Sequence, residues 1–184
     1  MTAEARARDP LESRAADLAE VAKRTGGRVS IEAVPFLGQI SLRLDPSLAD
    51  QAPFSLPLEP NTATESGERT ALWLGPDEWL VLGPPHTGHV IAKELEDALD
   101  GLHPSVIDVS ANRAVIDLGG PGRHELLASG CPLDLHPRSW HAGMCAQTLF
   151  AKTQVILHER TGTTRVLVRP SFAPYAIDRL LATL

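Results

Sequence analysis

Two cysteines and two histidines form the most metal-like group in the sequence. Cys131, His136, His141 and Cys145 offer thiolate and imidazole, the ligand types that zinc prefers. Their spacing, C-x4-H-x4-H-x3-C, matches none of the usual close ligand pairs. A buried apolar cysteine at a helix end, with surface histidines in a loop, explains the same residues. We therefore predict no metal ligands, with a zinc-binding module as the alternative.

Motifs for nucleophilic catalysis and phosphate binding are missing. No serine lies in a G-x-S-x-G sequence, and a Cys/His pair would need a contact in space that the sequence does not define. The glycine-rich segment 119–122 follows an apolar run, but it has neither the G-x-G-x-x-G order nor the lysine of a P-loop. It predicts a structural turn. No catalytic or cofactor-binding residue is therefore predicted.

Three residues are candidates for a partner interface: Trp73, Trp79 and Arg113. The two tryptophans flank a turn with the same alternation parity, and tryptophan is common both in cores and at interfaces. If Ala114 and its alternate neighbours face the core, Arg113 and Asp117 face outward. Arg113 would then pair with Asp108 or with a partner chain, whereas Asp117 is expected on a solvated strand face.

Composition narrows the class of protein. The chain has 184 residues, 43% of them hydrophobic, and a net charge of -6 without a cluster of lysine or arginine, which argues against nucleic-acid binding. No apolar run is long enough to span a membrane, and the N-terminus has no apolar signal core, so we expect a cytoplasmic protein. Two cysteines make no disulfide framework and suit a reducing compartment.

The elements that must position these residues follow from periodicity and turn signals. We expect one compact α+β protein over 1–184, with an N-terminal helical segment at 1–27. Four prolines lie in 45–69, which predicts an irregular connector lying against a surface. The remaining core, 70–184, predicts a hairpin, a helix, two strands, a helix, three strands and a final helix.

The stretch 106–135 defines the fold class. It reads as strand, turn, strand and helix, with β-branched runs before the glycine-proline break. Helices separated by pairs of strands indicate an α+β fold rather than a parallel doubly wound sheet. We predict ferredoxin-like split βαβ units.

Several motifs then carry a family resemblance. The segment 74–80, LGPDEWL, resembles the signature of the gamma subunit of heterotetrameric sarcosine oxidase. Similar matches extend from about Val29 over nearly the whole chain, and they include the motifs Phe36-Leu37-Gly38-Gln39, Asp108-Val109-Ser110, Arg113-Ala114, Gly120-Pro121, Cys131-Pro132-Leu133-Asp134-Leu135 and Arg169-Pro170-Ser171-Phe172.

The resemblance implies one subunit of a complex that oxidises sarcosine to glycine. Oxygen becomes hydrogen peroxide, and the methyl carbon becomes formaldehyde or passes to tetrahydrofolate. In that family FAD, FMN, NAD, zinc and the folate site belong to the alpha, beta and delta subunits. The resemblance therefore implies a structural gamma subunit that binds no cofactor itself and docks chiefly on alpha.

A second resemblance concerns the fold. The strand, turn, strand, Gly120-Pro121 and leucine helix resemble the folate-binding domain of the glycine-cleavage T-protein. That family has an acidic pair just before a strand that corresponds to the one starting near Gln154. Here the segment 151–153 reads Ala-Lys-Thr, which supplies no carboxylate for folate chemistry. A stand-alone folate-binding, aminomethyltransferase-like protein is the alternative function.

Overall fold

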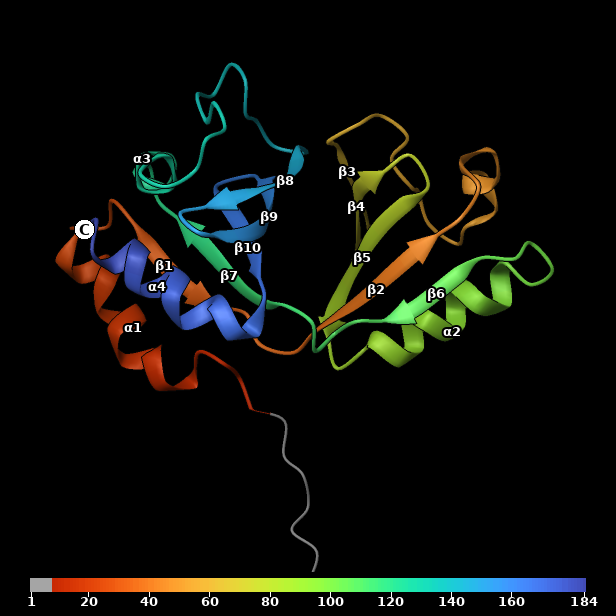
Figure 1. Cartoon of the computed structure of the whole chain (residues 1–184), viewed down its shortest axis with the longest axis horizontal. Coiled ribbons are helices and arrows are strands. Elements are labelled where there is room, and N and C mark those ends of the chain that lie inside the picture. The colour runs from red at the N-terminus through yellow and green to blue at the C-terminus, as the bar shows by residue number, and fades with distance from the viewer. Residues whose placement is uncertain (1–7) are drawn as a thin grey trace, which may run out of the picture.

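Two antiparallel five-stranded sheets, flanked by helices, make up the fold (Figure 1). The computed structural model describes residues 8–184, so the first seven residues of the predicted N-terminal segment lie outside it. The α+β class is confirmed. Within residues 8–184, no helix combines the length and the apolar character needed to cross a membrane.

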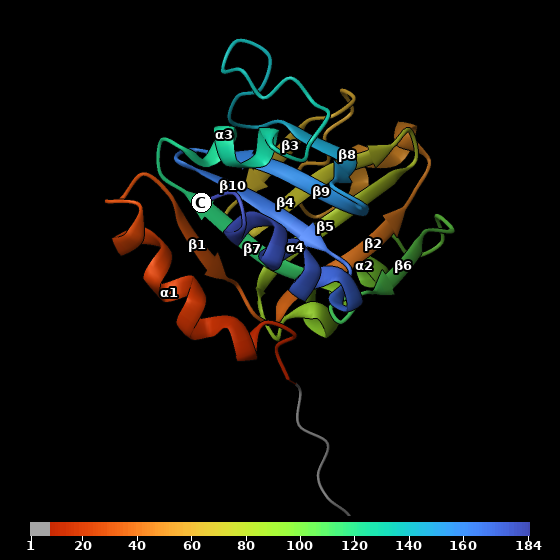
Figure 2. The same cartoon turned by 60° about the vertical axis from the view of Figure 1, so that its left-hand side comes forward.

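Sheet A carries most of the helices on its outer face. Figure 2, with this side turned forward, shows α1 and α4 lying over the sheet. Leu118, Leu157 and Val166 of the sheet pack there against Val21 of α1 and Ile177 of α4. In spatial order the strands are β1 (Ser30–Ala33), β7 (Ala114–Gly119), β10 (Thr163–Val168), β9 (Thr153–Arg160) and β8 (Cys145–Phe150). The covering helices are α1 (Ala15–Arg24), α3 (Arg123–Ala128) and α4 (Ala173–Leu181). The short helices η1 (Glu12–Arg14) and η3 (Pro170–Phe172) directly precede α1 and α4.

Sheet B contains a split βαβ unit, as predicted. Strands β5 and β6 both pair antiparallel with β2, so they run parallel to each other on either side of it, and α2 connects them. In spatial order the strands are β3 (Ala63–Ser66), β4 (Arg69–Gly75), β5 (Glu78–Pro85), β2 (Leu37–Arg43) and β6 (Ser105–Asp108). The outer face is covered by η2 (Pro46–Gln51) and α2 (Gly88–Ala98).

The inner faces of the two sheets share a third core. Leu72 and Leu80 of sheet B pack with Val115 and Leu167 of sheet A. Val115 is thus buried on the face opposite Ile116, which belongs to the core beneath the helices. This face of β7 was expected to be solvated at Asp117. That expectation was wrong because a second sheet covers this face.

The proline-rich segment 45–69 is more regular than predicted. It contains η2 and strand β3, which pairs antiparallel with β4. Strand β3 has weak local signals, and its hydrogen bonds come from a tertiary partner that sequence pattern does not reveal. The segment does lie against a surface, namely sheet B of the same chain, where Leu56 joins the outer core.

The stretch 106–135 connects the two sheets. Its first strand, β6, belongs to sheet B and its second, β7, belongs to sheet A. The chain crosses between them at 109–113, beside an earlier crossing at 34–36. Gln39, only 1% exposed, holds the later crossing, because its Nε2 donates to the carbonyls of Ser110 at 3.2 Å and Arg113 at 2.9 Å.

Candidate functional site

The four metal-like residues are separated by the fold. Cys131 and Cys145 are buried, and His136 and His141 are exposed in the segment 132–144. The Cys145 thiol donates to the carbonyl of Thr62 at 3.2 Å, and burial raises its pKa to about 11. Within residues 8–184, no group of three or more His, Cys, Asp and Glu is placed to hold a metal ion.

The two tryptophans have different environments. Trp73 and Trp79 are direct cross-strand partners on β4 and β5. Trp79 is fully buried, and its Nε1 donates to the carbonyl of Pro57 at 2.7 Å. Trp79 therefore has no surface to offer a partner, because the proline-rich segment of its own chain covers it. Trp73 is half-buried and keeps part of its ring accessible.

The segment 151–153 contains the β8–β9 hairpin turn, at 151–152, and the first residue of β9, Thr153. Ala151 has a φ of 51°, its N–H donates to the carbonyl of Gly130 at 2.7 Å, and the next residue, Lys152, is exposed. The hairpin therefore holds a methyl group and an ammonium where the T-protein resemblance implies carboxylates. This turn carries no group able to accept a proton from an amine.

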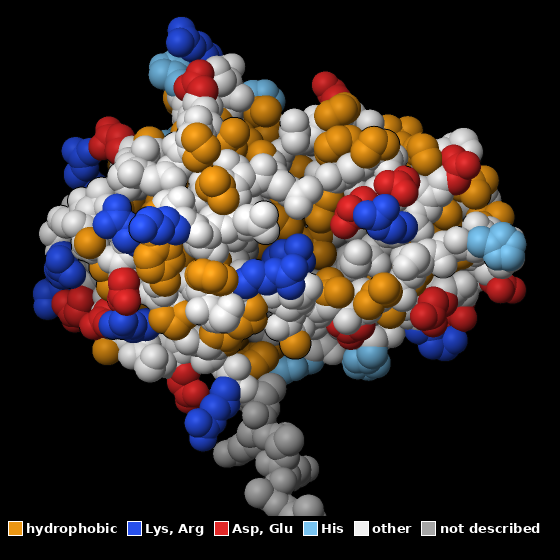
Figure 3. Space-filling view, in the orientation of Figure 1, with side chains coloured by type: hydrophobic (Ala, Val, Ile, Leu, Met, Phe, Trp, Pro, Cys, Tyr) orange, Lys and Arg blue, Asp and Glu red, His pale blue; other side chains and the backbone are white. Residues whose placement is uncertain are grey.

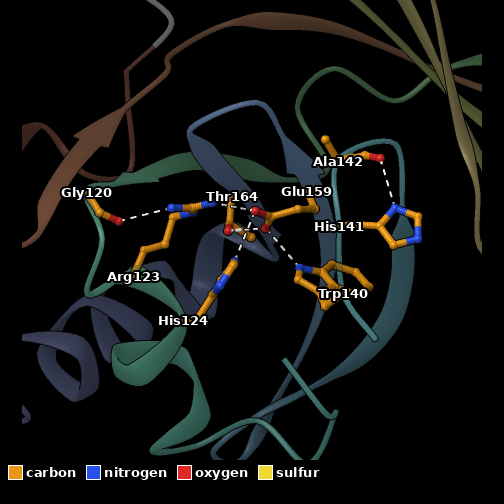
Figure 4. Close-up of polar contacts among 8 residues, drawn as sticks. All are labelled: Gly120, Arg123, His124, Trp140, His141, Ala142, Glu159 and Thr164. Carbon is orange, nitrogen blue, oxygen red and sulfur yellow. Dashed lines mark hydrogen bonds and ion pairs between the residues drawn. The ribbon is translucent and has the colours of Figure 1, made fainter. Parts of the chain in front are cut away.

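A buried carboxylate on β9 was missed by the sequence analysis. Glu159 is 2% exposed, and both of its oxygens are hydrogen-bonded (Figure 4). Oε1 accepts from Arg123 Nη2 at 2.8 Å and lies 3.0 Å from His124 Nε2. Oε2 accepts from Trp140 Nε1 at 2.9 Å and from the Thr164 hydroxyl. We call these five residues the Glu159 cluster.

The Glu159 cluster joins three separate segments. Arg123 and His124 come from α3, Trp140 from the segment 132–144, and Thr164 from β10. Arg123 Nη1 also donates to the carbonyl of Gly120 at 3.1 Å, so the guanidinium ties the helix start to the acid. A charge with this many donors is structurally satisfied, and it anchors the helix and the segment 132–144 to sheet A. The signal in the sequence was an acid two positions after the apolar run 155–157.

The inner face of sheet A carries an ion pair at one end. Arg165 donates to Asp117 through Nε and Nη2, both at 2.8 Å, in a two-pronged pair, and Arg160 Nη1 lies 3.4 Å from the same carboxylate. The side chains of Asp117 and Arg165 are 15% and 12% exposed. Asp117 was expected on a solvated face, and this was wrong because β10 and the opposing sheet enclose it.

The other end of the same face opens into a cavity of about 450 Å³. Arg113 and Arg169 line it together with polar side chains of β8 and β9, and we call it the Arg113 cavity. Its remaining walls are Gln147, Thr148, Leu149, Gln154, Val155, Ile156 and Leu167. Figure 3 shows Lys and Arg side chains gathered in the hollow near the middle of the molecule. Arg113 forms no ion pair with Asp108, whose carboxylate accepts from the Ser110 hydroxyl at 2.6 Å.

Comparison with solved structures first defines the class of fold. The chain is similar to the glycine cleavage system aminomethyltransferase T from Bartonella henselae, with a TM-score of 0.66 over 84% of this chain and 45% of that one. The sequences are 13% identical, so this likeness establishes the fold alone. The predicted T-protein-like architecture is thereby confirmed.

Closer relatives then define the family. Residues 43–181 match the sarcosine oxidase, gamma subunit family. The chain is 36% identical over 166 residues to sarcosine oxidase subunit gamma of Corynebacterium sp. (strain P-1), covering 85% of this chain and 80% of the relative. It is 37% identical to the subunit of Arthrobacter sp. over the same shares. The chain belongs to the sarcosine oxidase gamma subunit family.

A solved complex contains a chain with the same fold. In the heterotetrameric sarcosine oxidase from Corynebacterium sp. U-96 in complex with pyrrole 2-carboxylate, one chain aligns with a TM-score of 0.85 and 32% identity. The alignment covers 96% of this chain and 93% of that one. The two folds therefore agree over nearly their whole lengths.

Proposed function

We propose that this chain is the gamma subunit of a cytoplasmic heterotetrameric sarcosine oxidase and acts as a structural subunit docked chiefly on the alpha chain. The observation that carries the proposal is the match over nearly the full length to a chain of a solved heterotetramer. The complex would oxidise sarcosine to glycine, yielding hydrogen peroxide and either formaldehyde or methylene-tetrahydrofolate. FAD, FMN, NAD, zinc and folate would bind to its alpha, beta and delta subunits.

Three features of the chain support a role without catalysis. The β8–β9 hairpin carries Ala151 and Lys152 where folate chemistry would need an acid. The buried acid Glu159 has both oxygens occupied by donors of its own chain. The thiol of Cys145 is protonated at neutral pH, since its pKa is raised to about 11, and a protonated thiol is a poor nucleophile.

The proposed contact surface includes two of the three residues singled out in the sequence. Trp73 is half-buried, and Arg113 lines an open cavity. Trp79 is left out because its side chain is fully buried. Tryptophan and arginine are enriched where protein surfaces meet, and both residues can reach a partner without unfolding the chain.

Co-expression with the other three subunits tests this function. A tag on this chain is expected to recover alpha, beta and delta in equal amounts, together with sarcosine oxidase activity. The complex assembled from alpha, beta and delta without this chain is the control, and lower yield or stability is expected for it. Recovery of the tagged chain alone would contradict the proposal.

The T-protein-like fold favours one alternative, a folate-binding protein that acts alone. Titrating tetrahydrofolate into the isolated chain in a calorimeter separates the two functions. No heat is expected at high ligand concentration. Binding at micromolar concentration would favour the alternative.

A further inference from the structure

Two arginines face each other across neighbouring strands at one wall of the Arg113 cavity. Val168 of β10 pairs with Ala114 of β7, so Arg169 and Arg113 occupy the next position of the same antiparallel register. Like charges placed opposite each other on a sheet repel and lower stability. Their pairing is therefore a cost to the isolated chain unless an anion lies between them.

The part of the chain that the structure describes supplies no such anion. Neither Arg113 nor Arg169 takes part in a salt bridge within residues 8–184. Glu78 is the acid whose charge acts on Arg113, and its carboxylate already accepts from Arg43 Nη2 at 2.8 Å. Arg169 donates instead to the neutral amide oxygen of Asn112. Burial, followed by the nearby Arg169 charge, lowers the pKa of Arg113.

The same two strands carry an acid at their other end. There Asp117 of β7 binds Arg165 of β10 through two hydrogen bonds of 2.8 Å. The strand pair thus neutralises one of its cations internally and leaves Arg113 and Arg169 without a carboxylate. Arg113 is half-buried and Arg169 is exposed, so both guanidiniums are open to a counter-charge from outside the described chain.

The cavity has the anatomy of an anchoring pocket. The amides of Gln147 and Gln154 line it beside the guanidiniums. Gln147 Nε2 already donates to the carbonyl of Leu74 at 3.0 Å. Leu149 on the edge strand β8 is 47% exposed and contributes an apolar rim. Arginine is enriched where protein surfaces meet. The positive site also lies on a chain with a net charge of -6, so it is not a general feature of the surface.

We propose that the Arg113 cavity receives the carboxylate of an Asp or Glu side chain from another subunit of the complex. Two guanidiniums provide donors that match the two oxygens of a carboxylate, and the amides around them exclude bulk water when the subunits close. This inference rests on the proposed function, because it names the chemistry by which the subunit docks.

Salt titration of the assembled complex tests the contribution of the two charges. With Arg113→Gln and Arg169→Gln together, this chain is expected to bind its partners on the order of thirty-fold more weakly or worse, and to dissociate at lower salt. Arg179→Gln, an exposed arginine on α4, removes a charge elsewhere and is expected to change nothing. Thermal unfolding of the isolated variants verifies that both still fold.

A chemical crosslink identifies the acid. In the complex with Arg113→Lys, a zero-length carbodiimide reagent is expected to join the new amine to an Asp or Glu of another subunit, as found by mass spectrometry. The wild-type complex is the control, because a guanidinium does not form this amide. A crosslink confined to Glu78 of the same chain would overturn the inference.

The remaining outcomes separate the inference from the function on which it rests. Unchanged salt dependence of the double variant, with normal recovery of the partners, overturns the inference alone. Failure of the wild-type chain to recover any partner overturns both. Glutarate that binds the isolated wild-type chain and not the double variant, while assembly is unaffected, would assign the cavity to a free carboxylate and also overturn the inference.

Discussion

The two faces of sheet A differ in whether their charged side chains are paired within the chain. On the outer face, the Glu159 cluster surrounds one carboxylate with donors from three segments of the same chain. On the inner face, Arg113 and Arg169 share a cavity without an acid from the described residues. A buried charge that is paired within the chain stabilises the fold. A charge without a counter-charge in its own chain is available to pair with another molecule.

The difference predicts unequal effects of charge removal on the stability of the isolated chain. Removing the acid of the Glu159 cluster leaves buried donors without an acceptor, so the isolated chain should lose stability. Removing a cation of the Arg113 cavity relieves repulsion, so the isolated chain should lose nothing. Four measurements follow, from the largest expected effect to the smallest.

Glu159→Gln is expected to lower the free energy of unfolding by about 3 kcal/mol or more. The substitution removes the charge that pairs with Arg123 and points an amide N–H at donors in a buried site. Urea unfolding of the isolated chain measures it. Glu125→Gln is the control, because its ion pair with Arg28 has side chains 77% and 67% exposed and should contribute less than about 1 kcal/mol. Equal effects of the two substitutions would contradict the comparison.

Acid is expected to destabilise the chain through His158, which is buried on the inner face of β9. Burial, followed by the charges of Arg165 and Arg160, lowers its pKa from 6.5 to about 4. Between these values the unfolded chain binds a proton that the folded chain does not, so stability falls as the pH falls from about 6.5 to about 4. The loss is about 3 kcal/mol at the lower end.

His158→Gln isolates this contribution from that of the carboxylates. The variant should show a smaller loss of unfolding free energy over that pH range, measured by urea unfolding at several pH values. Above about pH 7, the slopes of the two chains against pH should agree. Parallel curves through the acid range would show that His158 is not the group that titrates.

Trp140→Phe is expected to lower the free energy of unfolding by about 1–3 kcal/mol, since it keeps an aromatic ring but leaves Glu159 Oε2 with one donor fewer. Amide hydrogen exchange in the segment 132–144 should also become faster. Trp73→Phe is the control with the same change in size, at a half-buried tryptophan outside the cluster. A larger effect at Trp73 would argue against the anchoring role of the indole N–H.

Arg113→Gln in the isolated chain is expected to leave the free energy of unfolding unchanged or raise it by at most about 1 kcal/mol. The substitution removes the repulsion between the like charges of Arg113 and Arg169. Arg165→Gln is the matched variant at the paired end of the same strands. It should lower the unfolding free energy by roughly 2 kcal/mol, since Asp117 loses two hydrogen bonds. A comparable loss at Arg113 would mean that the chain itself satisfies this cation.

Local patterns predicted the elements well. The hairpin around the turn 75–77 and the strand-strand-helix of 106–135 are encoded by alternation and turn residues within a few positions. Strand β3 was not predicted, because its pairing with β4 and not its own residues makes it a strand. Trp79 was placed on a candidate surface because parity identifies a face but not what covers it.

The two charged sites depended on distant contacts. Glu159 and Arg123 lie 36 positions apart in the chain, and no spacing rule links an acid in a strand to a helix that precedes it by such a distance. Arg113 was singled out from its place beside a strand. Its cross-strand neighbour, Arg169, could be identified only from the register of β7 with β10. Pairing across a sheet is a property of topology, which local periodicity does not specify.

The order of strands has a consequence for how the chain folds. All five strands of sheet B lie in the continuous stretch 37–108, whereas β1 of sheet A precedes this stretch and its neighbour β7 follows it. During synthesis, the whole of sheet B leaves the ribosome before β7 does, so β1 waits unpaired for its partner. Ile31 meets Leu118 only by closing a loop that contains an entire sheet. We therefore expect sheet B to form first and sheet A to close around β7 later in folding.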